Sequence, residues 1–200
     1  MIPLRRFLFG GLLPGILLTG CAPESPEPES EIRVLLAGQA LIKKDPRLRW
    51  DDPYGSLRPM LDRADVAFTN FEMAVLSEPD RCGAPADYEV SFGTPRLPGE
   101  SRAGNSGGPH AVAPDVMDFL AALGFNLMSL SNNHAWDLGD CGVAATREAA
   151  EENQVTHAGI GSDRASATAP SYLTVGDFTI ALIAATTSHD ARDAIGHAVN

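Results

Sequence analysis

The stretch GFNLMSLSNNHAWDLG, residues 124–139, contains the signals that decide the fold. Residues 125–130 are mostly apolar, and the segment is short and follows a glycine, which is typical of a buried strand. Three polar residues follow the run after a single serine, namely Asn132, Asn133 and His134. The stretch therefore predicts a buried strand whose carboxyl end carries groups that can bind or react.

Working outward from this stretch, apolar runs alternate with helical stripes. The predicted elements are, in chain order, a strand at 32–37, a helix over 57–64, a strand at 66–70, a helix over 114–123, the strand at 125–130, a helix at 139–153, a strand at 155–158, and a hairpin of 172–175 with 178–184. This alternation predicts an α/β fold with a largely parallel sheet. The continuous apolar run 32–37 suits a strand buried on both faces. Residues 82–110 show no periodicity and are expected to form a long excursion.

Polar groups directly follow three of the predicted strands. Gln39 comes after the first strand, Asn70 and Glu72 after the second, and the asparagine pair with His134 after the third. In parallel sheets the carboxyl ends of the strands meet at one edge, and sites form there. We therefore expect these three clusters to lie close together.

Glu72, Asn133 and His134 offer carboxylate, amide and imidazole ligands for a hard or borderline divalent cation. A two-metal centre of such ligands activates water and clamps a phosphate or carbonyl oxygen. Alternatively, His134 protonates a leaving group as a general acid, and Asp137, three residues further on, orients the imidazole.

Ordinary structural roles fit the same residues. An asparagine after a strand is often a turn residue or a helix cap, and Asp137 can belong to the cap of the helix that follows. A histidine at a strand end is often a hydrogen-bonded structural group. The remaining histidines have no motif around them and are expected at the surface or in loops; these are His110, His157, His189 and His197.

The N-terminus has the pattern of a secretory signal over residues 1–20. Arg5 and Arg6 precede an apolar run, 7–18, that is too short to span about 30 Å of hydrocarbon. Its end, Leu18-Thr19-Gly20-Cys21, resembles the bacterial lipobox, in which the cysteine is acylated, for example with palmitate. Cys21 as an ordinary signal-peptide residue is the alternative, and export by the Sec or the Tat route is left open.

Lipidation of Cys21 would place the protein on the outside of the cytoplasmic membrane, or on the outer membrane of a Gram-negative cell. Residues 21–31 are rich in proline and glutamate, so we expect a stiff tether that lifts the domain off the bilayer.

Charge and cysteine content limit the partners. The chain has 15 lysines and arginines against 26 acidic residues, a net charge of −11, which disfavours nucleic acid as a partner. Of the 3 cysteines, Cys82 and Cys141 remain if Cys21 is lipidated. Their spacing fits a disulfide in an oxidising compartment, and it fits two unpaired thiols equally well.

Four segments together look like the CapA family. They are LLAGQ at 35–39, ADVAFTNFE at 64–72, the stretch at 124–139, and HAGIG at 157–161. The similarity covers about residues 32–185. The resemblance implies a role in capsule and poly-γ-glutamate synthesis and a domain similar to the sandwich of calcineurin-like metallophosphatases.

By their match to the family motifs, Asn70, Glu72, Asn133 and His134 fall at positions that would hold a divalent metal ion such as Mn, Fe, Zn or Mg. Gln39 stands where the family usually has aspartate, and a neutral amide is a poorer bridge between two cations.

Family domains also continue further and bear additional histidines. Residues 32–189 are therefore expected to form a partial domain, the N-terminal half to two-thirds of the sandwich, followed by a tail at 190–200. Such a half-sandwich would leave an apolar sheet face to be covered otherwise.

Three functional hypotheses follow from the resemblance. The first is a lipid-anchored, metal-dependent hydrolase of the phosphoesterase type in exopolymer synthesis or export. The second is a non-catalytic assembly or export factor that works beside the exopolymer synthase and export components. The third is a truncated, inactive remnant.

Overall fold

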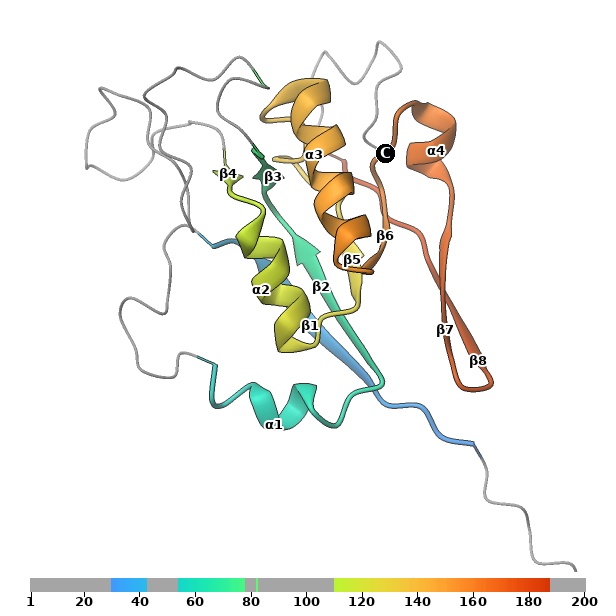
Figure 1. Ribbon diagram of the computed structural model, residues 1–200. Coiled ribbons are helices and arrows are strands. Elements are labelled where there is room, and N and C mark those ends of the chain that lie inside the picture. Colours follow the sequence, from blue (N-terminus) through green and yellow to red (C-terminus); the bar gives the residue numbers. More distant parts are fainter. Residues whose placement is uncertain (1–29, 43–53, 78–81, 83–109, 188–200) are drawn as a thin grey trace, which may run out of the picture. The chain divides into compact units, whose positions relative to one another are not determined.

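A computed structural model describes residues 30–42, 54–77, 82 and 110–187 (Figure 1). The chain divides into two units, 1–30 and 31–200, and the description below concerns the second unit. The predicted signal, the lipidation site and the predicted tail lie outside the described residues. Within the described part, no helix is both long and apolar enough to cross a membrane.

A four-stranded sheet positions the rest of the fold. Its strands are β1 (Val34–Ala40), β2 (Val66–Phe71), β5 (Leu127–Ser129) and β6 (Thr156–Ala158), in the order β1-β2-β5-β6. Every neighbouring pair is parallel. The α/β fold with a parallel sheet, predicted from the alternation of apolar runs, is confirmed.

Two helices cover one face of this sheet, α2 (Asp115–Leu123) and α3 (Gly139–Glu152) (Figure 1). α2 ends as the sequence predicts, at Gly124, whose φ of 113° is left-handed. Buried residues between the helices and the sheet form one apolar cluster. They include Ala67 and Phe71 of β2, Met128 of β5, Val116, Met117 and Leu120 of α2, and Val143 and Ala149 of α3.

β1 differs from the prediction of a strand buried on both faces. Leu35 and Ala37 pack against the core, but Val34 is 49% exposed and Leu36 is 73% exposed. Among the described residues β1 is an edge strand, and the helices cover only one face of the sheet. The residues of this apolar run therefore face the core and the solvent in turn. The sequence of the run does not show this, because the position of a strand at the edge of a sheet is set by its pairing with other strands.

The helix predicted over 57–64 is also shorter than expected. α1 spans only Arg58–Leu61. The amides of Asp65 and Val66 donate to the carbonyl of Arg33, at 2.9 Å and 3.1 Å, which starts the pairing of β2 with β1. Because Asp65 and Val66 are already hydrogen-bonded to the segment that leads into β1, the helix ends after one turn.

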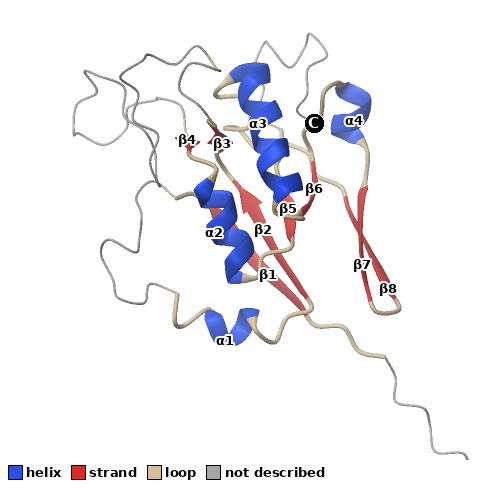
Figure 2. Cartoon of the chain, viewed as in Figure 1, coloured by secondary structure: helices blue, strands red, loops and turns tan. Residues whose placement is uncertain are grey.

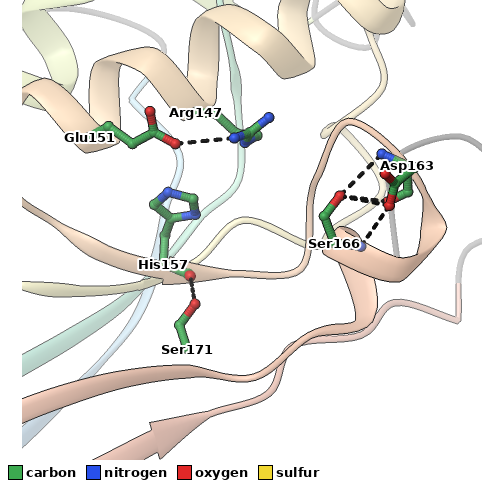
Figure 3. A network of polar contacts seen from close by, with 6 residues as sticks. All are labelled: Arg147, Glu151, His157, Asp163, Ser166 and Ser171. Carbon is green, nitrogen blue, oxygen red and sulfur yellow. Dashed lines mark hydrogen bonds and ion pairs between the residues drawn. The ribbon is translucent and has the colours of Figure 1, made fainter.

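The smaller elements complete the architecture (Figure 2). They are the parallel pair β3 (Ala74–Val75) and β4 (Ala111–Val112), the short helix α4 (Arg164–Thr168), and the antiparallel hairpin of β7 (Ser171–Val175) with β8 (Phe178–Leu182). The hairpin was predicted, whereas β3, β4 and α4 were not. α4 begins with a capping box, in which Asp163 and Ser166 exchange side-chain to backbone hydrogen bonds (Figure 3).

A disulfide bond joins Cys82 to Cys141, whose Cα atoms lie 5.2 Å apart at a sequence separation of 59. Cys141 lies in the first turn of α3. The bond therefore attaches the chain beyond β3 to the helix that covers the sheet.

We predict that replacing both cysteines, Cys82→Ser with Cys141→Ser, lowers the free energy of unfolding by about 4 kcal/mol, because the bond closes a long loop in the unfolded chain. Urea unfolding under oxidising conditions measures this loss. Dithiothreitol should destabilise the wild type by a similar amount and leave the double variant unchanged. A loss under about 1 kcal/mol would contradict a cross-link that restricts the unfolded chain.

Candidate functional site

The carboxyl edge of the sheet brings the predicted polar residues together. Gln39, Asn70 and Ser129 lie in register on the adjacent strands β1, β2 and β5. Glu72 follows β2 directly, and its amide donates to the carbonyl of Ala40 at 3.1 Å. Asn70 alternates with the core residue Phe71, so it lies on the face opposite the helices.

The side chain of Asn132 holds the next turn in place. Its Nδ2 donates to the carbonyl of Phe71 at 2.8 Å and to that of Leu130 at 3.4 Å, and its Oδ1 accepts from the amide of His134 at 2.9 Å. Asn132 is buried, whereas Asn133 is exposed. The two neighbouring asparagines therefore differ: Asn132 ties the ends of β2 and β5 to the turn, and Asn133 faces solvent.

His134 and Asp137 form a hydrogen-bonded pair. His134 Nδ1 lies 2.8 Å from Asp137 Oδ2, and each side chain is 20% exposed. A carboxylate only accepts hydrogen bonds, so the proton of the neutral imidazole resides on Nδ1 and the lone pair on Nε2. This arrangement presents Nε2 as the nitrogen that can bind a cation or exchange a proton.

A second histidine, His110, lies against this pair. Its ring stacks on that of His134, with centroids 3.6 Å apart and planes 23° apart. Its backbone amide donates to Asp137 Oδ2 at 2.6 Å. His110 lies in a loop, as predicted, and is half-buried. The sequence did not place it near His134. It directly precedes β4, and the pairing of β4 with β3 brings it to the site, but a strand of two residues is too short to be recognised in the sequence.

The side-chain oxygen of Asn70 is a further polar atom at this edge of the sheet. Its Oδ1 is buried and has no hydrogen-bond partner in the described structure. Leaving a buried carbonyl oxygen unsatisfied costs roughly 1–3 kcal/mol, so such an oxygen in a native site calls for a ligand, a water or an ion.

The residues at the edge fit a hard cation. Gln39 and Asn70 supply amide oxygens and Glu72 a carboxylate, which are the donors that Mg²⁺ and Mn²⁺ prefer. Across the described ranges, no group of three or more His, Cys, Asp and Glu side chains is placed to hold a metal. The donors that the described residues offer at this edge are therefore mainly amide and carboxylate oxygens.

Comparison with known proteins defines the family to which the chain belongs. Residues 33–199 match the family described as "Bacterial capsule synthesis protein PGA_cap", and the chain belongs to this family. The resemblance inferred from the sequence motifs is confirmed.

Two curated relatives are the uncharacterized proteins y4sH and y4uA of Sinorhizobium fredii (strain NBRC 101917 / NGR234). Each is 31% identical to this chain over 135 residues, which is 68% of this chain. The same match covers 26% of each relative, so the chain spans about a quarter of their length.

His157 lies apart from the His134 pair, on β6 beneath α3 (Figure 3). Its Nδ1 is buried without a hydrogen-bond partner in the described structure. Burial lowers the pKa of His157 below its ordinary value of 6.5; Glu151 partly opposes this shift and Arg147 adds to it. Ser171 of β7 donates to the carbonyl of His157, which joins the hairpin to the sheet. The expectation of a surface or loop position is therefore wrong for His157, which lies in a strand of the sheet.

We predict that this buried imidazole makes the stability depend on pH. With the pKa lowered in the folded state, the unfolded chain binds the proton first as the pH falls below 6.5. The free energy of unfolding should therefore decrease as the pH is lowered below this value. His157→Phe should reduce the slope of the free energy of unfolding against pH. Urea unfolding between about pH 5.5 and 7.5 measures it, a range in which ordinary carboxylates stay ionised. Equal slopes for wild type and variant would contradict the prediction.

Proposed function

We propose that this chain is a lipid-anchored protein of the cell envelope that acts in the synthesis or export of a capsule polymer of the poly-γ-glutamate type. We propose further that the sheet edge is a metal-dependent phosphoesterase-like hydrolase site. The observation that supports the catalytic proposal is the His134 Nδ1 to Asp137 Oδ2 hydrogen bond of 2.8 Å. The Oδ1 of Asn70, at the carboxyl end of β2, is buried without a hydrogen-bond partner in the described structure, which supports the proposed cation site.

In this proposal His134 exchanges a proton at Nε2. When protonated, it donates that proton to the oxygen of a leaving group, and the Asp137 carboxylate stabilises the imidazolium and keeps the ring in orientation. Asn132 fixes the backbone of His134 at the end of β5, so the ring is presented from a rigid element.

Gln39, Asn70, Glu72 and the exposed Asn133 are the residues that would hold the cation. A cation in such a site supplies activation of water and neutralisation of charge on a phosphoryl oxygen. Oxygen donors favour Mg²⁺ or Mn²⁺, and these donors leave Nε2 of His134 for proton transfer.

The hydrolase proposal predicts Mn²⁺-dependent turnover of a generic phosphodiester such as bis-p-nitrophenyl phosphate. His134→Ala should lower kcat by roughly 100-fold or more, because general acid catalysis is lost. Asn70→Ala should raise the Mn²⁺ concentration needed for half-maximal turnover. Tyr172→Ala, on the exposed hairpin, is the matched control and should retain full activity. A turnover rate that does not change with Mn²⁺ concentration, or a His134→Ala rate equal to that of the wild type, would contradict the proposed hydrolase site.

A second candidate function is a non-catalytic assembly or export factor. It is favoured by Gln39, which stands where the family usually has a charged ligand, and by the lack of a three-residue His, Cys, Asp and Glu cluster within the described residues. Its partners would be the membrane, through the anchor, and components of an exopolymer synthase or exporter. In this case a His134→Ala strain would make wild-type amounts of polymer, whereas deletion of the whole chain would stop production.

Membrane attachment rests on the segment Leu18-Thr19-Gly20-Cys21. We predict that cells fed radiolabelled palmitate incorporate label into this chain and that it fractionates with membranes. Cys21→Ser should abolish the label and release the protein into the soluble envelope or medium, whereas Cys82→Ser should leave the label intact. A Cys21→Ser chain that still carries palmitate would contradict lipidation at this residue.

A further inference from the structure

We propose that His110 is a positioning residue for His134. The inference deepens the proposed function and rests on it, because it assigns His134 as the reacting imidazole. It is carried by two contacts from one residue: the ring of His110 stacks on that of His134 at 3.6 Å, and the backbone amide of His110 donates to Asp137 Oδ2 at 2.6 Å.

The two contacts do different things. A single hydrogen bond from Nδ1 to a carboxylate leaves an imidazole able to rock about that bond. A ring stacked at 3.6 Å fills one side of the imidazole and fixes its plane. The amide of His110 holds the carboxylate oxygen that His134 uses, so it fixes the other end of the hydrogen bond.

Substitution separates these roles, because the backbone amide remains in every variant. The side chain of His110 therefore acts on the plane of the His134 ring, while its main chain acts on Asp137. His110→Phe keeps a flat ring for stacking and removes both ring nitrogens. His110→Ala removes the ring altogether. If stacking is what matters, the phenylalanine variant behaves as wild type and the alanine variant does not.

The test is long-range nitrogen–proton NMR of the histidine rings in the purified, untagged, ¹⁵N-labelled full-length chain. The chain has 5 histidines, and His134 is assigned by the signal that His134→Gln removes. At about pH 8, where imidazoles are neutral, wild type and His110→Phe should show one His134 ring with the proton on Nδ1. His110→Ala should show His134 nitrogen signals averaged between the two tautomers. Thermal unfolding of each variant establishes that it is folded.

A kinetic arm complements the spectra. In His110→Ala, kcat should fall roughly tenfold with KM unchanged, because the imidazole of His134 is misoriented while substrate is still bound. His110→Phe should have the kcat of the wild type.

Unchanged His134 signals in a folded His110→Ala chain would overturn the proposal. A loss in His110→Phe as large as in His110→Ala would overturn it too, since a ring nitrogen would then be required. If no variant turns over substrate but the His134 signals change as described, the hydrolase proposal fails and the positioning role stands.

Discussion

The turn after β5, and with it the position of His134, depends on one buried side-chain amide, that of Asn132. Its hydrogen bonds reach the carbonyls of Phe71 and Leu130 at the ends of two parallel strands, and the amide of His134 in the following turn. A buried amide group that lost these partners would leave several polar atoms unsatisfied at once, so the turn has one stable conformation. The sheet alone gathers polar residues at an edge; Asn132 gives one of them, His134, a fixed position.

Covalent and polar contacts then attach the neighbouring segments to this turn. Cys82 is bonded to Cys141, which lies in the first turn of α3 and only a few residues beyond Asp137. His110 contacts both members of the His134–Asp137 pair. The pair is therefore held from two directions, by Asn132 at the ends of the strands and by His110 at the start of β4.

Short sequence patterns predict the parts of the fold that neighbouring residues determine. The segment 66–70 predicts a strand, and Gly124 predicts the end of a helix; the structure contains both. Leu36 shows the limit, because an apolar residue at an edge strand is indistinguishable in sequence from one in the middle of a sheet. His110 shows the same limit for the site. It comes near His134 only through the pairing of β4 with β3, and a two-residue strand leaves no recognisable pattern.

The central proposal is that Asn70 and Glu72 bind a cation at this edge of the sheet. The most direct measurement is anomalous diffraction from crystals of the protein grown with Mn²⁺. The account predicts a peak about 2.2 Å from Asn70 Oδ1 and from a carboxylate oxygen of Glu72. Crystals in which Asn70 Oδ1 is instead satisfied by a protein hydrogen bond, with no anomalous peak at this edge under saturating Mn²⁺, would contradict it.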